Sequence, residues 1–186
     1  MTAEELREII ACGETSKVQF KLMFSTPKQV AEEMVAFANS KGGMIVFGVE
    51  DRTGRIVGLS YAEIQKLSNE VSTAANDQVR PVIYLETEVV LVEGKRLLIA
   101  YIHEGSNKPY KTLGGNIWVK QGSDKRRIVE NNEILSLFQA SGVTMPTRRS
   151  LLEPAWPTLK WPISTTISKG YMASRKSRLG CLSISC

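Results

Sequence analysis

Basic side chains are concentrated in one short segment of the chain, residues 105–127. The segment contains six basic residues and only one acidic residue, Asp124. It also contains four glycines and two aromatic residues, Tyr110 and Trp118. Basic groups neutralise phosphates, N–H groups in glycine turns can cradle them, and aromatic rings stack on unpaired bases. The segment therefore predicts a contact surface for DNA or RNA. The alternative is a solvated hairpin edge whose lysines discourage pairing between sheets. The basic residues are Lys108, Lys111, Lys120, Lys125, Arg126 and Arg127.

A glycine pair, Gly42-Gly43, separates an expected helix from an expected strand. Glycine adopts positive φ and lets another backbone come close, so the pair predicts a tight junction between the two elements. Asn39, near the end of the helix, is expected to bond the carbonyls that the helix leaves free. Gly48 and Gly122 are also expected to be structural.

The elements that must position these residues follow from the spacing of apolar residues. Helices are predicted at 4–11, from Pro27 with Thr26 as N-cap, at 61–76 and at 133–138 with Asn131 or Asn132 as cap. Strands are predicted at 18–22, 44–49, 55–59, 82–92, 95–103 and 116–120. This mixture predicts an α+β fold with a mixed, mostly antiparallel sheet of about five to six strands and flanking helices.

The net charge of +5 comes from the C-terminal part of the chain. Residues 145–186 contain seven Lys or Arg and one acid, Glu153, so residues 1–144 carry 17 basic and 18 acidic residues. The same part holds four of the seven prolines and has no sustained apolar period. We therefore predict one domain, residues 1–143, and a basic irregular tail, residues 144–186. The tail is either a natural linker-like segment or a frameshifted, non-native continuation.

Composition excludes several kinds of site. Three cysteines, Cys12, Cys181 and Cys186, cannot form a disulfide framework, and a single histidine, His103, excludes a histidine-rich metal site. No apolar run approaches the ~20 residues of a membrane span, and residues 1–5 lack the layout of a signal peptide. We therefore expect a cytoplasmic protein with no membrane partner.

Two strings of residues carry a resemblance to a known family. The first runs from Glu14 and the stretch Gln-Phe-Lys (19–21) through Ala-Phe-Ala-Asn-Ser-Lys-Gly-Gly (36–43) to Gly-Val-Glu-Asp (48–51). The second contains Lys-Pro-Tyr (108–110), Trp-Val-Lys-Gln-Gly-Ser (118–123) and Arg126. The chain resembles the Schlafen-type AlbA-like (AlbA_2, divergent AAA-4) domain of bacterial transcriptional regulators and helicase-related proteins. The resemblance implies an AlbA-like fold that binds nucleic acid.

The resemblance also implies a rival function, metal-dependent cleavage of RNA or DNA. Some Schlafen-family members are RNA nucleases with three acidic residues, two in the spacing Glu-x4-Glu and one after the Gly-Val strand. Glu14 matches the first position and Asp51 or Glu50 the third, but the second position is Gln19. An amide cannot supply the negative charge that holds Mg²⁺ or Mn²⁺. We therefore expect a binding domain rather than an enzyme, with Glu14 and Asp51 catalytic only in the alternative.

ATP binding is a second rival, because relatives carry an ATP-binding label. The chain contains no Gly-x4-Gly-Lys-Ser/Thr loop, and Gly114-Gly115 is followed by Asn116-Ile117. We therefore predict no cofactor, and ATP or a divalent metal belongs only to the alternatives.

The predicted function is backbone-phosphate binding to DNA or RNA by a module of a bacterial transcriptional regulator. Binding is expected to be salt-sensitive and weakly sequence-specific, because no helix carries Arg, Asn and Gln on one face. By analogy with AlbA-like folds, a homodimer through the hairpin at 82–103 is also expected. The predicted contacts are Lys21, Lys41, Lys108, Lys111, Lys120, Arg126 and Arg127 for phosphate, and Tyr110 for stacking.

Overall fold

The computed structural model describes residues 1–142, and the predicted tail lies outside the described residues. Its four helices are α1 Ala3–Cys12, α2 Pro27–Asn39, α3 Tyr61–Gln78 and α4 Asn131–Ala140. Its strands are β1 Val18–Lys21, β2 Gly43–Phe47, β3 Val79–Arg80, β4 Leu85–Val92, β5 Lys95–Ile102, β6 Lys111–Thr112, β7 Ile117–Gln121 and β8 Asp124–Ile128. The α+β class predicted from the sequence is confirmed.

The strands form one larger sheet and two small pairs. The sheet has four strands in the order β1-β2-β5-β4, and the two-stranded pairs are β3-β6 and β7-β8. β1 and β2 are parallel, with Val18 opposite Met44, whereas β2, β5 and β4 pair antiparallel. The expected single sheet of five or six strands is thus divided, but its mixed, mostly antiparallel character is confirmed.

One predicted strand is wrong. Residues 55–59 contribute only two isolated bridges, from Ile56 to Val49 and from Leu59 to Arg96. Gly58, with φ +84°, lies between them, and a Cβ there would meet the Lys95 side chain at 2.8 Å. The chain therefore touches the sheet at two points without running along it.

Local capping explains where the helices begin. The Thr26 side chain accepts a hydrogen bond from the Gln29 N–H and Pro27 occupies the first turn of α2, as predicted. Ser60 forms a capping box with Glu63 at the start of α3. The cap predicted for α4 is wrong, because Glu130 stands at its N-cap without a side-chain capping bond and Asn131 is already helical.

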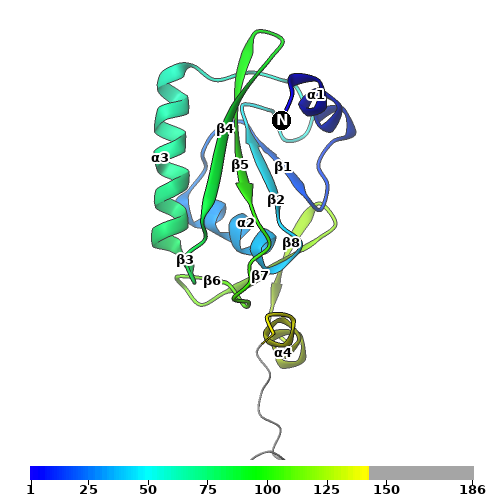
Figure 1. Cartoon of the computed structure of the whole chain (residues 1–186), viewed down its shortest axis with the longest axis vertical. Helices are drawn as coiled ribbons and strands as arrows, with labels where there is room; N and C mark the ends of the chain where they lie inside the picture. Colours follow the sequence, from blue (N-terminus) through cyan, green and yellow to red (C-terminus); the bar gives the residue numbers. More distant parts are fainter. Residues whose placement is uncertain (143–186) are drawn as a thin grey trace, which may run out of the picture. The chain divides into compact units, whose positions relative to one another are not determined.

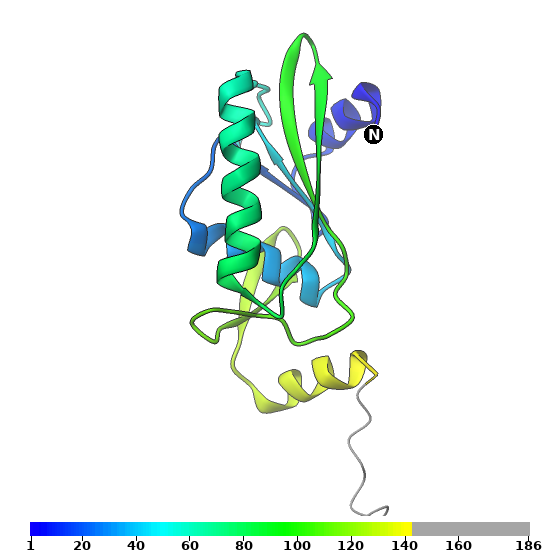
Figure 2. The same ribbon diagram turned by 60° about the vertical axis from the view of Figure 1, so that its left-hand side comes forward.

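The four-stranded sheet is covered on both faces. Ile45 and Phe47 of β2 belong to a core shared with α2 and α3, whereas Val46 between them belongs to a core with Leu6 of α1. This alternation is what a strand covered on two sides requires. Figures 1 and 2 show α2 and α3 on one side of the sheet and the β4–β5 hairpin extending past it. No helix within residues 1–142 combines the length and apolar character that a membrane crossing requires.

The Gly42-Gly43 pair forms the predicted tight junction between α2 and β2. Gly42 has φ +69°, and a Cβ there would lie 2.8 Å from the Ile102 carbonyl oxygen. A Cβ on Gly43 would lie 2.4 Å from the Phe37 ring and 2.5 Å from the Lys17 carbonyl oxygen. Gly43 does not have a positive φ, so for this residue close approach alone requires glycine.

Candidate nucleic-acid interface

Asn39, the last residue of α2, connects the two strings of residues that carry the family resemblance. Its buried side-chain amide donates to the carbonyl oxygens of Tyr110 at 2.8 Å and Trp118 at 2.9 Å, and its Oδ1 accepts from the Tyr110 N–H at 2.7 Å. The expectation that Asn39 bonds carbonyls of its own helix is therefore wrong. The amide instead fixes the loop before β6 and the strand β7 against the end of α2.

The β7–β8 hairpin lies along α2 and directs alternate side chains toward it. Trp118 pairs with Arg127 and Lys120 with Lys125 across the hairpin, and the Lys120 N–H donates to the Ser40 hydroxyl at 2.9 Å. Lys120 and Lys125 lie opposite each other on the face of the hairpin that reaches Glu33 of α2, whereas Arg127, further along β8, is exposed. The cations that the sequence analysis treated as exposed thus include several that face the body of the domain.

Lys120 is buried at the centre of a polar network. Its Nζ donates to the Gln19 Oε1 at 2.9 Å and the Ser123 carbonyl oxygen at 2.5 Å, and lies 3.7 Å from the Glu33 Oε2. Burial lowers the pKa of Lys120, and the negative charge of Glu33 opposes that effect. With only 1% of its side chain exposed, Lys120 is not available to a phosphate, which corrects the expectation for this residue.

Lys108 has a structural position at the C-terminus of α2. Its Nζ donates to the Ser40 carbonyl oxygen at 3.0 Å and to the Glu104 Oε1 at 2.6 Å. A cation at this end of a helix compensates the partial negative charge of the free carbonyls. The hydrogen bond from Lys108 also lowers the pKa of Glu104. Lys108 is 8% exposed, so the expectation of an open phosphate contact is wrong here too.

Tyr110 is buried and cannot offer a free ring face. It is 6% exposed and belongs to the core between the sheet and helices α2 and α3. A Cβ on Gly105 would lie 2.0 Å from the ring, so the glycine backbone covers that part of the ring directly. The predicted stacking role is corrected to a packing role.

Two further cations of the hairpin are paired with acids. Lys125 lies 3.0 Å from the Glu32 Oε2 and 3.3 Å from the Glu33 Oε1. Arg126 donates to both carboxylate oxygens of Glu133 on α4, at 3.0 and 2.6 Å. This hydrogen-bonded pair raises the pKa of Arg126 and lowers that of Glu133. Arg126 is exposed, so a phosphate would compete with a solvent-screened ion pair.

The other predicted contacts keep a free charge. Lys41, Lys111 and Arg127 are exposed and Lys21 is half-buried, and none of them forms an ion pair with another residue of the described range. Lys17 shares these properties and was missed by the sequence analysis. The sequence position of Lys17 could have indicated it as a candidate contact, because Lys17 precedes one predicted strand much as Lys41 precedes another.

The predicted catalytic carboxylates are not brought together. Glu14 Oε1 accepts hydrogen bonds from the Gln19 amide and from the Phe20 N–H, so these first two motif positions do meet. Asp51 lies in an exposed turn, where the neighbouring Glu50 accepts a hydrogen bond from Thr53. Among residues 1–142 no three His, Cys, Asp or Glu side chains form a group that could hold a metal ion.

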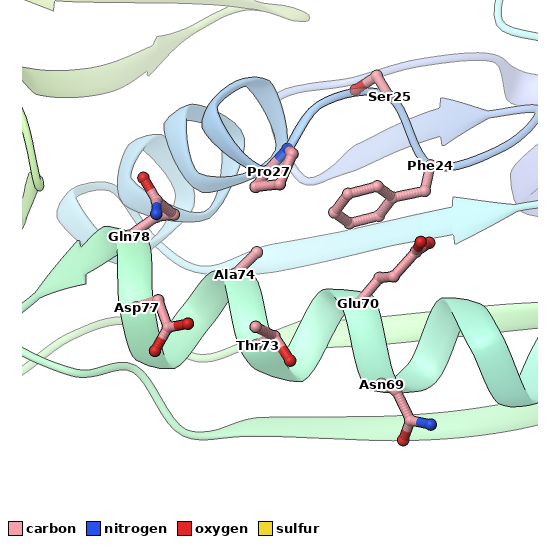
Figure 3. Close-up of a pocket in the computed structure, with 9 residues that line it drawn as sticks. All are labelled: Phe24, Ser25, Pro27, Asn69, Glu70, Thr73, Ala74, Asp77 and Gln78. Atoms are coloured by element: carbon pink, nitrogen blue, oxygen red, sulfur yellow. The ribbon is translucent and has the colours of Figure 1, made fainter.

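A separate cavity of about 400 Å³ lies between the N-terminus of α2 and α3. Figure 3 shows the Phe24 ring and the Glu70 carboxylate at this cavity, with Asp77 further along α3. Its lining contains two carboxylates and no lysine or arginine. The charge of this cavity is therefore unsuited to a phosphate group.

Known proteins share this fold. The N-terminal domain of a Nitrosomonas europaea protein described as related to the ATP-dependent DNA helicase RecG aligns with a TM-score of 0.52 and 25% identity, over 70% of this chain and 96% of that domain. The DIP2311 protein of Corynebacterium diphtheriae aligns with a TM-score of 0.51 and 21% identity, over 74% of this chain and 32% of that one.

Sequence comparison finds a curated relative and a family. An uncharacterized ATP-binding protein of Ureaplasma parvum serovar 3 is 29% identical over 87 residues, which is 45% of this chain. The match spans 24% of that relative, about a quarter of its length. The profile of the Schlafen, AlbA_2 family matches residues 14–129, which include Glu14, Asn39, the Gly42-Gly43 pair and the whole β7–β8 hairpin. The chain therefore belongs to the Schlafen, AlbA_2 family.

Proposed function

We propose that this domain binds DNA or RNA through backbone phosphates, as a module of a transcriptional regulator. Membership in the family and the fold shared with a helicase-related domain support a nucleic-acid ligand. The observation that carries the proposal is the set of predicted cations that stay free of carboxylates within residues 1–142: Lys21, Lys41, Lys111 and Arg127.

Two of these cations belong to segments that Asn39 joins. Lys41 follows Asn39 by two residues, and Asn39 donates to the carbonyl oxygen of Trp118, which is paired with Arg127. An exposed cation without a carboxylate partner loses little when it meets a phosphate, because no internal ion pair has to break. Phosphate contacts alone position a nucleic acid and carry no sequence information, so weak specificity is expected.

The test is fluorescence anisotropy of labelled single-stranded and double-stranded oligonucleotides with full-length protein. Lys41→Ala/Arg127→Ala is expected to weaken binding about tenfold at low salt. Lys66→Ala is the control, because Lys66 is an exposed cation of α3 whose Nζ lies 3.8 Å from Glu70. Equal affinity of the double variant and the control would contradict the proposal.

Metal-dependent cleavage, the alternative function, stays a prediction and has an assay of its own. If the domain is a metal-dependent nuclease, the wild type degrades labelled RNA or DNA in Mn²⁺ and Glu14→Ala does not. We expect intact substrate, because Gln19 occupies the second acidic position of the motif.

The homodimer also stays a prediction. β4 is the last strand of the four-stranded order, and Val89 and Leu91 on it are 49% and 56% exposed. A long edge strand with apolar side chains favours pairing with another strand. The molar mass from light scattering is expected to be that of two chains, and to fall to one for Val89→Lys.

A further inference from the structure

We propose that the cavity beside the Gly42-Gly43 turn binds one phosphate group of a nucleotide. This inference rests on the proposed function and names a specific phosphate site for it. The cavity has a volume of about 220 Å³. Ligand pockets for drug-sized molecules span roughly 300–1,000 Å³, so this one suits a smaller group such as a phosphate with part of its sugar.

Two lysines are placed at this cavity by the parallel pairing of β1 and β2. Lys17 immediately precedes β1, Lys41 precedes the glycine pair that opens β2, and both line the cavity. The Lys17 carbonyl oxygen accepts a hydrogen bond from the Met44 N–H at 2.8 Å. Because the two strands are parallel and adjacent, their first residues lie at the same end of the sheet (Figure 1). The fold therefore brings both lysines to the cavity that Gly42 and Gly43 line.

The charge of the lining favours an anion. Lys17 and Lys41 are exposed and have no ion pair with any residue of the described part of the chain. The one carboxylate in the lining, Glu104, accepts a hydrogen bond from the Lys108 Nζ, which balances its charge.

The other two titratable groups of the lining do not cancel this positive charge. The Tyr101 hydroxyl donates to Glu88 at 2.8 Å, and burial, with that hydrogen bond, raises the pKa of Tyr101 to about 12, so the phenol stays neutral. His103 lies 3.6 Å from Glu86, and both side chains are largely exposed. The lining thus has two lysines that form no ion pair and one carboxylate, Glu104, whose pKa is lowered mainly by the hydrogen bond from Lys108 and also by the nearby charge of Lys41.

The phosphate can belong to a strand, to the end of a strand or to a free nucleotide. All three present the same anionic oxygens to Lys17 and Lys41, so the structure assigns the phosphate chemistry, and the experiment separates the sources. Three probes do this: an oligonucleotide with a 5′-hydroxyl, the same oligonucleotide with a 5′-phosphate, and ATP.

His103 makes the test direct, because it is the only histidine in the 186 residues and it lines the cavity. Its ring protons therefore give one resolved pair of proton NMR signals in the full-length protein. We expect a saturable shift of these signals with at least one probe. In Lys17→Ala/Lys41→Ala, half-saturation is expected to need an about tenfold higher probe concentration. Lys28→Ala/Lys66→Ala, which removes the same charge from exposed sites of α2 and α3, is expected to match wild type.

Anisotropy of the same oligonucleotides separates the possible failures. If the oligonucleotides bind but the His103 signals do not move, the cavity is not the phosphate site, while the proposed function stands. If ATP alone moves the signals and no oligonucleotide binds, the phosphate site stands and the proposed function fails. Equal saturation of wild type and Lys17→Ala/Lys41→Ala with every probe also overturns the cavity assignment.

Discussion

The Asn39 side chain and the Tyr110 backbone exchange two hydrogen bonds across 71 residues of sequence, with the Asn39 amide donating at 2.8 Å and its Oδ1 accepting at 2.7 Å. A third bond, to the Trp118 carbonyl oxygen, joins β7 to the same amide. One side chain therefore holds together the end of α2 and the two segments that follow the main sheet. The free cations Lys41 and Arg127 lie next to this junction in the chain and in the pairing of β7 with β8.

Asn39→Ala is expected to lower the free energy of unfolding by about 3 kcal/mol, because it leaves a buried N–H and two carbonyls without partners. Urea unfolding followed by circular dichroism measures the change. Asn69→Ala, at an exposed position of α3, is the control and is expected to change the free energy by less than about 0.5 kcal/mol. A loss as small as the control's would show that the Asn39 bonds do not stabilise the domain.

Gly43→Ala is expected to lower the free energy of unfolding by about 3 kcal/mol, because its Cβ would collide with Phe37 and the Lys17 carbonyl. Gly94→Ala is the matched control. Gly94 has φ +74° in the β4–β5 turn, but a Cβ there has nothing within 4 Å, so only backbone strain of about 1 kcal/mol is expected. If Gly43→Ala destabilised the domain as little as Gly94→Ala, Gly43 would not be in tight contact with Phe37 and the Lys17 carbonyl, and the described junction would be contradicted.

Lys120→Met is expected to destabilise the domain by about 3 kcal/mol, because it leaves the buried Glu33 carboxylate with only Lys125 as counter-charge. The double variant Glu33→Gln/Lys120→Met is expected to recover about half of this loss, since the charge of the buried Glu33 is removed together with that of Lys120. Thermal unfolding of the four proteins in the cycle gives the comparison. Full stability of Lys120→Met would mean that Lys120 is solvent-exposed, as the sequence analysis predicted.

The Glu104–Lys108 pair is expected to make stability depend on pH. The pKa of Glu104 is lowered in the folded protein, mainly by the hydrogen bond from Lys108, so the pair stabilises above the ordinary pKa of the carboxyl. That stabilisation is lost as the pH falls through the lowered folded-state pKa. The difference in Tm between wild type and Glu104→Gln is therefore expected to be largest near pH 7 and to shrink toward pH 3. A difference in Tm that stays constant between pH 7 and pH 3 would contradict a stabilising Glu104–Lys108 pair.

The sequence predicted most of the elements because their signals are local. Thr26 and Pro27 mark the start of α2 by their own side-chain chemistry, and Glu93-Gly94 marks the β4–β5 turn, where both residues have positive φ. The prediction of a strand at 55–59 was wrong, because its apolar residues pair with the rest of the chain only at two isolated bridges. The divided sheet could not be predicted, because pairing between strands depends on contacts distant in the sequence.

The candidate site was predicted less well, for an electrostatic reason. Lys108, Lys120 and Lys125 meet Glu104, Glu33 and Glu32, and two of these acids lie on α2, far from the basic segment in the sequence. Local charge density therefore overestimated the free charge of the hairpin. Arg126 was likewise neutralised by Glu133, seven residues away but on a separate element.

The salt dependence of oligonucleotide binding tests phosphate recognition most directly. The slope of log K against log salt concentration counts released counterions, at about 0.7 per phosphate contact for a single strand. Residues 145–186 add seven basic residues to every full-length variant alike, so the difference in slope isolates the folded domain. We predict that Lys41→Ala/Arg127→Ala reduces the slope by about 1.4, whereas Lys66→Ala leaves it unchanged. Identical slopes for wild type and the double variant would contradict the account.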